Sequence, residues 1–412
     1  MRVLIITSAT VCGGAEAYAL TIAQAAAQSG WETHAAFPLA DATASLRHEM
    51  TAHHVTYHSL EIAEPLSRGI RAMGDAFVRW WRTRSLLLTL KPDVVLINLP
   101  WADHCLGSIL ACGQLRVPTA VMFHLIPPEK IPLSRSRRQL YTWARNRGQQ
   151  WLTNSTTNCC LLAELFEMSA DDLQFIYNGI TLPALEDCTP EKRAMLRQAV
   201  RQELGIPSST RLLLTVGRLA PQKGYTDLLA IIPSVLADHP DTRFVWAGAG
   251  EQQQELHDRL REAEIDHAVL MLGHRTDLPR LLQAADLFVF PTRFEGHPFA
   301  LLEAMAYRLP IVTTNASSIP EFIEHREQGL LCPVGDSKAL LHTLHWALQH
   351  PKQMQQMAEK ANQHVNHFSQ EHMLEQTLNR LQTLAFLTKK ESNPTTARNR
   401  ALEPVVKEQK RC

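Results

Sequence analysis

The sequence predicts an α/β protein made of two doubly wound, Rossmann-like domains. Short apolar runs alternate with longer helical segments through the first 180 residues, and after a break near residue 190 the same alternation starts again. A chain of 412 residues with 45% hydrophobic content is also long enough to bury two separate cores. We therefore expect a first domain over residues 1–180 and a second over 191–366.

The first domain is expected to hold a mostly parallel sheet with helices between its strands. It opens with a strand at 3–7, a polar loop that contains glycines, and an Ala-rich helix over 15–28 that Gly30 closes. Because strands and helices alternate, successive strands should run parallel. Further strands are predicted at 31–37, 53–59, 93–98, 119–123, 151–154 and 174–178.

The second domain repeats this plan after a linker at 181–190, where two prolines stand and the periodicity is lost. A helix over 191–204 leads into it, and a long helical stretch is expected over 337–364 near its end. Its strands are predicted at 211–216, 242–247, 268–272, 286–290, 310–314 and 330–332. A last amphipathic helix covers 369–387, and the polar residues 388–412 are expected to be disordered.

The composition argues against several classes of protein. Lys plus Arg equals Asp plus Glu at 41 each, so the overall charge gives no reason to expect a nucleic-acid partner. Eight cysteines occur without a Cys-x-x-Cys pair, which is typical of the reducing cytosol and offers no metal-finger spacing. No run of eighteen apolar residues is present, so we expect no transmembrane helix. A cytoplasmic location is the expectation.

Two glutamates stand in the stretch 286–303, which reads as strand, loop and helix. Pro291 ends an apolar strand, the loop carries Glu295 and Gly296, and Pro298 opens a helix that contains Glu303. Ligands of open α/β sheets bind at the carboxyl ends of strands, and a helix N-terminus there suits an anion such as a diphosphate. The two carboxylates would then accept hydrogen bonds from sugar and ribose hydroxyls. The alternative is a solvated Glu303 and a loop Glu295 without function, which we favour for one glutamate alone but not for the pair.

Two cations follow the first strand of the second domain. Arg218 and Lys223 lie in a loop that begins with Gly217 and ends with Gly224, where a helix begins close to the sheet. At the carboxyl end of a strand they would neutralise a diphosphate leaving group as a glycosidic bond breaks. Ordinary surface charges are the alternative, and the nearby glutamate stretch favours the functional interpretation.

The first domain offers a glycine pair and a histidine at strand ends. Gly13 and Gly14 follow the first strand and would let the backbone approach a ligand closely. The Gly-x-Gly-x-x-Gly fingerprint is absent, which disfavours an NAD site. His124 follows the strand at 119–123, at the edge where the inter-domain cleft is expected. A structural histidine is an equally good interpretation.

The middle of the first domain is basic. Residues 68–150 contain 13 Lys and Arg against 4 Asp and Glu, a net of +9, together with Trp80 and Trp81. A basic, tryptophan-bearing surface of this kind could lie on anionic lipid. An ordinary amphipathic helix that packs on the sheet explains the pattern equally well.

Taken together, these motifs resemble the retaining glycosyltransferase family 4. The most specific parts are the Glu295 and Glu303 pair within Pro-x-x-x-Glu-Gly-x-Pro…Leu-Leu-Glu-Ala-Met, and the Val-Gly-Arg…Lys-Gly segment that holds Arg218 and Lys223. The segments 13–16, 178–180, 248–250 and 330–336 also fit, and the resemblance is strongest over 211–336. It implies the GT-B fold, with two Rossmann-like domains facing a central cleft and the last helix packed back on the first domain.

The resemblance also implies roles for individual residues. Arg218 and Lys223 would bind the diphosphate and stabilise its departure, Glu295 would contact the donor sugar, and Glu303 would hold the ribose hydroxyls. His124, Arg218, Lys223 and Glu295 are the catalytic candidates. The implied donor-binding set is Gly13, Gly14, Arg218, Lys223, Arg275, Glu295, Gly296, His297, Phe299, Ala300 and Glu303. His297 is a less usual residue at its position in the motif, so the resemblance does not indicate which sugar is transferred.

The function implied is a metal-independent, retaining hexosyltransferase. Its donor would be a UDP- or GDP-linked sugar held mainly by the second domain, and its acceptor a glycan or a lipid-linked sugar against the first. It would serve the assembly of cell-surface polysaccharide or lipopolysaccharide, in the cytoplasm or peripherally on the inner face of the cytoplasmic membrane. A nucleotide-sugar epimerase of the same fold and a non-catalytic nucleotide-sugar-binding protein are the alternatives.

Overall fold

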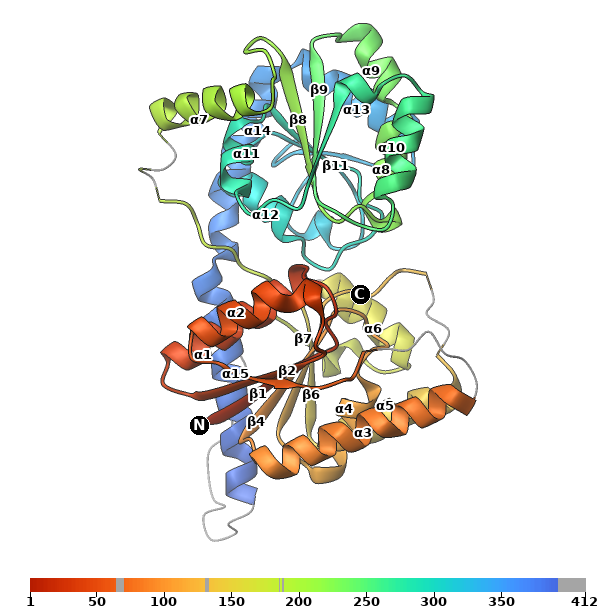
Figure 1. Ribbon diagram of the computed structural model, residues 1–412, viewed down its shortest axis with the longest axis vertical. Helices are drawn as coiled ribbons and strands as arrows, with labels where there is room; N and C mark the ends of the chain where they lie inside the picture. Colours follow the sequence, from red (N-terminus) through yellow and green to blue (C-terminus); the bar gives the residue numbers. More distant parts are fainter. Residues whose placement is uncertain (64–69, 130–132, 185, 187–188, 392–412) are drawn as a thin grey trace. The chain divides into compact units, whose positions relative to one another are not determined.

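The computed structural model of the protein describes residues 1–63, 70–129, 133–184, 186 and 189–391. The chain forms two compact units (Figure 1): unit 1 is Met1–Tyr177 with Met373–Cys412, and unit 2 is Asn178–His372. Chain crossings between the units therefore follow Tyr177 and His372. Residues 181–190, which the sequence suggested as a linker, are grouped with unit 2.

Unit 1 contains a seven-stranded sheet in the order β3-β2-β1-β4-β5-β6-β7. All its strand pairs are parallel, which confirms the doubly wound α/β fold class. The apolar runs of the central strands are buried on both faces, as in Val3–Ile6 of β1, whereas the two edge strands of the sheet are partly or fully exposed. The strands are β1 (Arg2–Thr7), β2 (Glu32–Phe37), β3 (Thr56–Ser59), β4 (Val94–Leu99), β5 (Thr119–Phe123), β6 (Gln149–Thr153) and β7 (Gln174–Phe175).

Helices cover both faces of this sheet (Figure 1). Two of them begin at a serine N-cap: Ser134 and Ser155 accept hydrogen bonds from the N–H groups of Arg137 and Asn158. The tyrosine hydroxyl of Tyr18 meets the hydroxyl of Thr377 at 3.1 Å, which joins the last helix to the first. The helices are α1 (Gly14–Gln28), α2 (Ala44–Ala52), α3 (Ile70–Leu90), α4 (Leu106–Leu115), α5 (Arg135–Arg145), α6 (Thr156–Phe166) and α15 (Gln370–Glu391).

Unit 2 contains a six-stranded, fully parallel sheet in the order β10-β9-β8-β11-β12-β13. Its strands are β8 (Arg211–Val216), β9 (Thr242–Ala247), β10 (Val269–Gly273), β11 (Leu287–Phe290), β12 (Ile311–Thr314) and β13 (Leu330–Cys332). Its helices are α7 (Pro190–Glu203), α8 (Tyr225–Leu229), α9 (Ile232–Asp238), α10 (Gln253–Glu262), α11 (Leu278–Ala284), α12 (Phe299–Ala306), α13 (Ser337–Gln349) and α14 (Pro351–His364). Two short 3₁₀ turns matter below: η4 (Pro221–Lys223) and η7 (Val365–Phe368).

Several predicted boundaries were wrong. The long helical stretch expected over 337–364 has those outer bounds but is divided into two helices, because Pro351 supplies no N–H and begins a new helix after His350. The strand expected from residue 53 begins at Thr56, since His53 and His54 complete the C-terminal turn of α2. The last helix extends to Glu391 instead of 387, and the predicted disorder beyond 391 lies outside the described residues.

Each unit has its own hydrophobic core. In unit 1, Trp151 packs against Phe123 and Phe166 with ring centroids 5.1 and 4.9 Å apart. In unit 2, Tyr225 packs against Trp246 at 5.1 Å. In the described part of the chain, no helix combines the length and the apolar character that crossing a membrane requires. Cys160 is disulfide-bonded, which the cysteine spacing did not predict, whereas Cys12, Cys105, Cys112, Cys159 and Cys332 are free thiols.

Candidate functional site

The predicted glutamate stretch lies at the switch point of the unit 2 sheet. Strand β8 comes first in the chain, β9 and β10 lie on one side of it, and β11 begins the other side. Loops that leave β8 and β11 therefore diverge at their carboxyl ends, where ligands of doubly wound sheets bind. Arg218 and Lys223 follow β8, and Glu295 and Gly296 follow β11.

The structure brings Lys223 and Glu295 into direct contact. The Lys223 ammonium donates to Oε1 of Glu295 at 2.5 Å, and the Thr292 hydroxyl donates to the same oxygen at 2.7 Å. Glu295 is only 5% exposed, so this buried carboxylate is compensated by a charge and a second donor. Among the described residues none donates to Oε2, which leaves that oxygen for a hydroxyl of a ligand.

A close approach of backbones fixes this pair. The Gln222 side chain donates to the carbonyl of Phe294 at 2.8 Å, and the N–H of Arg293 donates to the carbonyl of Gln222 at 2.7 Å. Gly224 adopts a left-handed conformation with φ +70°, and a Cβ there would overlap the carbonyl oxygen of Pro291. Only glycine permits this contact between η4 and the glutamate loop, residues 291–298.

Arg218 lies on a loop that a second pair of glycines supports. The N–H of Leu219 donates to the carbonyl of Ala249 at 3.1 Å, and Cβ atoms on Gly248 or Gly250 would overlap the backbone of residues 217–219. The Arg218 side chain is exposed, and in the described part of the chain it forms no ion pair. Its charge is therefore available to an anion.

Helix α12 supplies backbone donors and the second glutamate. It begins at Phe299 after Pro298, and the first N–H groups of a helix, here those of Phe299 and Ala300, have no partner within it. Glu303 lies one turn further on and is partly exposed. Burial of the carboxyl group raises the pKa of Glu303 to about 7. Nothing in the sequence pattern indicated that shift.

The ring of His297 lies in the interior of unit 2. It is 2% exposed and packs between Phe322 and Phe368, with centroid distances of 4.7 and 5.1 Å. Burial lowers the pKa of His297 to about 3, so the ring is neutral. Its carbonyl oxygen accepts a hydrogen bond of 2.7 Å from the Asn178 amide, so the backbone at this position is also fixed.

Arg275 is engaged in a separate ion-pair network. Its guanidinium donates twice to Asp277, at 2.7 and 2.8 Å, and once to Glu203 at 2.8 Å. The hydrogen bond to Asp277 raises the pKa of Arg275 above its ordinary value. These contacts join β10 to α7 and α11, apart from the bonds that hold Lys223 and Glu295.

In unit 1, the glycine pair and His124 are held by the backbone of α1. Gly13 is the N-cap of α1 and Gly14 its first residue. His124 is 6% exposed and its Nε2 lies 2.6 Å from Oδ1 of Asn98, while the Asn98 amide donates to the carbonyl of Ala15 at 3.0 Å. Because Oδ1 of Asn98 must accept, Nε2 of His124 carries the proton.

The protonation state of His124 follows from its surroundings. Burial lowers the pKa of His124 to about 3, and the ring packs edge-on against Tyr18 at 4.7 Å. The imidazole is therefore neutral, with Nδ1 as its acceptor. Sequence reasoning missed Asn98, although a polar residue within the apolar run of β4 was a signal. The predicted cleft between the domains stays a prediction.

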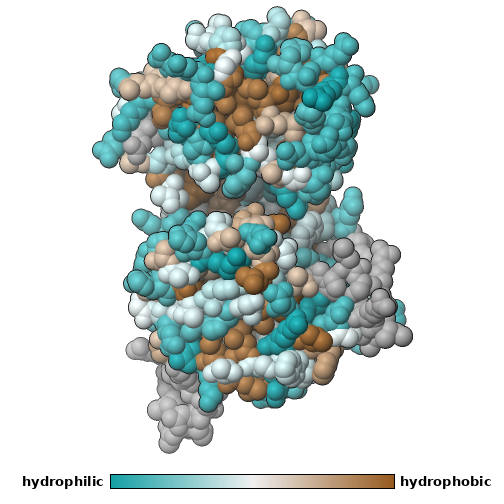
Figure 2. Space-filling model, in the orientation of Figure 1, coloured by the Kyte–Doolittle hydropathy of each residue, from teal (hydrophilic) through white to brown (hydrophobic). Residues whose placement is uncertain are grey.

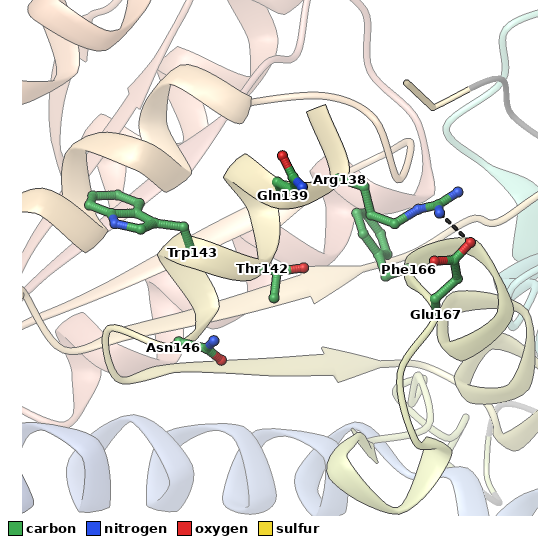
Figure 3. Close-up of a pocket in the computed structure, with 7 residues that line it drawn as sticks. All are labelled: Arg138, Gln139, Thr142, Trp143, Asn146, Phe166 and Glu167. Atoms are coloured by element: carbon green, nitrogen blue, oxygen red, sulfur yellow. Dashed lines mark ion pairs between the residues drawn. The ribbon is translucent and has the colours of Figure 1, made fainter. Parts of the chain in front are cut away.

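A cavity of about 430 Å³ lies elsewhere in unit 1, between α5 and the end of α6 (Figure 3). Its lining includes Arg138, which forms an ion pair with Glu167, and the side chain of Trp143 points away from that pair. None of the predicted site residues lines it. We therefore do not assign the candidate site to this cavity.

Two family models match the chain. Residues 12–182 match the model described as Glycosyltransferase Family 4, and residues 197–364 match the model described as Glycosyl transferases group 1. Together the two matches span most of the chain and both domains that the sequence predicted.

Curated relatives match part of the chain. A glycogen synthase of Mycobacterium tuberculosis is 30% identical over 235 residues, which is 57% of this chain and 53% of that protein. A UDP-Gal:alpha-D-GlcNAc-diphosphoundecaprenol alpha-1,3-galactosyltransferase of Escherichia coli is 30% identical over 144 residues, 34% of this chain and 37% of that protein. The chain spans about half the length, or less, of these relatives.

Solved structures share the fold over nearly the whole chain. HepE of Anabaena in complex with UDP-glucose superposes with a TM-score of 0.76 at 21% identity and covers 93% of this chain and 100% of that one. WaaG, a glycosyltransferase involved in lipopolysaccharide biosynthesis, gives 0.69 at 16% identity, covering 92% and 99%. At these identities the likeness shows a common GT-B fold.

Proposed function

Because the chain belongs to the group 1 and family 4 glycosyltransferases, we propose that it moves a sugar from a nucleotide-diphosphate sugar to a glycan or lipid-linked acceptor with retention of configuration. The observation that carries the proposal is the Lys223–Glu295 contact at the switch point of unit 2, with Arg218 on the loop that carries Lys223 and in no ion pair with any described residue. Two cations and a buried carboxylate in one place suit a diphosphate joined to a sugar.

In unit 2, cationic side chains and backbone N–H groups bind the diphosphate, whereas carboxylates bind hydroxyl groups. Arg218 and Lys223 neutralise the diphosphate as the bond between it and the sugar breaks, and the N–H groups of Phe299 and Ala300 add donors. The acceptor hydroxyl oxygen forms the new bond to the same sugar carbon. Its proton passes to the leaving phosphate oxygen, so the step balances without a metal ion.

The carboxylates of Glu295 and Glu303 bind the hydroxyl groups of the sugar and of the ribose, which flank the diphosphate. Glu295 binds a sugar hydroxyl through Oε2, since Lys223 and Thr292 occupy Oε1. Glu303 accepts hydrogen bonds from the ribose hydroxyls in its ionised form. For Gly13, Gly14 and the neutral His124 of unit 1, we propose the roles that the family resemblance implies. Arg275 contacts the base only if its bonds to Asp277 and Glu203 are exchanged.

The donor is UDP-linked in our proposal. The support is that solved relatives of the same fold were captured with UDP and UDP-glucose, and that one curated relative is named for UDP-Gal. Surface polysaccharide or lipopolysaccharide assembly is the proposed setting, because WaaG is described as involved in lipopolysaccharide biosynthesis and the galactosyltransferase is named for an acceptor linked to diphosphoundecaprenol. Of the six cysteines that the structure describes, five are free thiols and Cys160 is disulfide-bonded. We place the protein in the cytoplasm, where free thiols stay reduced.

Nucleotide binding tests the proposal. Calorimetric titration should show UDP binding, with GDP weaker by about tenfold or more, the cost of leaving a base-binding donor or acceptor unpaired. Arg218→Ala should weaken UDP binding, and Arg293→Ala is the matched control, since Arg293 is also exposed but pairs with Asp227. Binding of neither nucleotide would contradict the donor site. Conversion of UDP-glucose to a second UDP-sugar without acceptor would show an epimerase instead.

A peripheral contact with anionic membrane is a separate part of the proposal. Helices α3 and α5 flank α4, and together they contain eight arginines and one acidic residue. Apolar side chains lie among them at 39–62% exposure, and Figure 2 shows hydrophobic and hydrophilic residues intermixed on the visible face of unit 1. They are Phe77, Val78, Trp81 and Leu88 on α3, and Leu140 and Trp143 on α5. Side chains of this kind suit the interface of a charged bilayer.

Vesicle co-sedimentation tests this contact. Binding should be stronger to vesicles that contain phosphatidylglycerol than to phosphatidylcholine alone, and Trp81→Ala with Trp143→Ala should reduce it several-fold. Met195→Ala is the matched control, because Met195 is 71% exposed but lies in unit 2. Equal binding to both vesicle types would contradict the contact. The part of segment 68–150 at 68–69 and 130–132 lies outside the described residues.

A further inference from the structure

The two segments in which the chain passes between the units lie side by side within unit 2. The N–H of Ile180 donates to the carbonyl of Phe368 at 3.0 Å, and the N–H of Gln370 donates to the carbonyl of Ile180 at 2.8 Å. Ile180 and Ser369 thereby form a parallel bridge. We call residues 178–181 and 368–370 the paired crossing.

Glycine makes this pairing possible. A Cβ on Gly179 would overlap the carbonyl group of Ser369 and approach the N–H of Gln370. The Thr181 hydroxyl donates a further hydrogen bond of 3.0 Å to the side-chain oxygen of Gln370. The Asn-Gly-Ile motif, which has no part in the proposed chemistry, is therefore explained by the contact between the two segments.

One residue of the glutamate loop contacts both strands of the paired crossing. The carbonyl of His297 accepts the 2.7 Å bond from Asn178, whose side chain is 3% exposed. The His297 ring packs on Phe368, the residue that accepts from Ile180, and on Phe322. Because the ring is buried, it packs as a flat neutral group, and an aromatic ring of similar size should serve as well.

We infer that His297 is a positioning residue that fixes the glutamate loop to the paired crossing. Glu295 stands two residues before it, bonded to Lys223, and α12 begins two residues after it. A displacement of either strand of the paired crossing therefore moves the loop that carries Glu295 and the start of α12. The effect of this link on sugar transfer rests on the proposed function, whereas the link itself does not.

Hydrogen–deuterium exchange of the full-length chain without nucleotide tests the link. The amides of Ile180 and Gln370 are the reporters, since each donates within the paired crossing. His297→Ala should raise their exchange rates about tenfold, the effect expected from losing local packing and weakening one buried hydrogen bond. His297→Phe keeps an aromatic ring and should restore slow exchange. Should His297→Ala fail to fold, Asn178→Ala removes only the amide bond and is measured in the same way.

Phe244→Leu is the matched control. Phe244 is a fully buried aromatic residue in β9 whose truncation lowers the stability of unit 2 without touching the paired crossing. Unchanged exchange at Ile180 and Gln370 in His297→Ala, or an equal rise in Phe244→Leu, would overturn the inference. So would His297→Phe behaving like His297→Ala. A separate measurement with UDP should slow exchange over 291–303, and its failure would count against the donor site alone.

Discussion

At the scale of single residues, the Lys223–Glu295 contact determines what the site can do. A carboxylate that is 5% exposed would be costly without its lysine, because a buried charge needs a partner and hydrogen bonds. Arg218 compensates no buried charge, since it is exposed and forms no ion pair with any residue that the structure describes. The two cations should therefore behave differently when removed.

Substitution of the two cations separates stability from chemistry. Arg218→Ala should slow sugar transfer about 100-fold, the effect of removing one charge stabiliser, with little change in melting temperature. Lys223→Ala should slow transfer and also lower the melting temperature by several degrees, because Glu295 is left buried and unpaired. Steady-state kinetics and thermal denaturation check both. Full turnover in the two variants would contradict the phosphate role, and Arg293→Ala again serves as control.

The raised pKa of Glu303 gives binding a pH dependence. With a folded pKa of about 7, Glu303 is protonated in the free protein below that pH. Ribose binding by the carboxylate must then release a proton, so affinity for UDP-glucose should rise as pH increases from 5 to 7 and level off above. Calorimetry in buffers of different ionisation enthalpy measures the proton released. Glu303→Gln should remove the slope, and an unchanged slope in that variant would contradict the assignment.

The same shift affects stability with the opposite sign. Between the ordinary pKa of a glutamate, about 4.5, and the folded value of about 7, the unfolded chain loses the Glu303 proton while the folded chain keeps it. The folded state binds more protons over this window, so the contribution of Glu303 to stability falls as pH rises and is constant above it. Glu303→Gln should abolish this contribution.

At the scale of elements, sequence patterns predicted the positions of the strands, which depend on burial. They missed the ends of several elements, which depend on local hydrogen bonds. The strands of both sheets were predicted to within a few residues, because runs such as Leu287–Phe290 are apolar on both faces. The break at Pro351 and the late start of β3 depend on helix ends, where a single missing N–H or a left-handed residue such as His54 decides the boundary.

The site was predictable in part for the same reason. Lys223 and Glu295 follow neighbouring strands, so topology alone favours their contact once the strands are placed. The second donor, Thr292, depends on loop conformation and could not be read from spacing. Asn98, the partner of His124, lies within β4, where a polar residue in an apolar run was a signal that could have been used. The burial of the His297 ring was also missed, because periodicity does not show where a loop side chain points.

Gly224, at the start of α8, should be sensitive to substitution, because it combines a left-handed backbone with a close neighbour. Gly224→Ala should cost roughly 1–2 kcal/mol for the left-handed backbone and more for the overlap with Pro291. Gly205→Ala is the matched control, since Gly205 also has a positive φ of 65° but open space around it, so only the backbone cost applies. Urea denaturation compares the two. Equal losses of stability would contradict the argument from close approach.

At the scale of the whole molecule, two separately built units share one chain. Each has its own parallel sheet and its own core, and each matches a different family model. The chain passes between them twice, and within unit 2 the two passages are paired. The residues proposed to bind the nucleotide all belong to unit 2: Arg218, Lys223, Glu295 and Glu303.

A ligand of unit 2 should therefore stabilise that unit selectively. A ligand that binds the folded state at 100 times its dissociation constant stabilises it by about 2.7 kcal/mol. In scanning calorimetry, two cores should unfold in resolvable steps, and UDP should raise the temperature of one step while the other stays in place. Exchange measured by mass spectrometry identifies the stabilised step through peptides of β8, β11 and α12. Protection confined to peptides of unit 1 would contradict the assignment of the nucleotide to unit 2, because Lys223 and Glu295 would then lie away from the bound diphosphate.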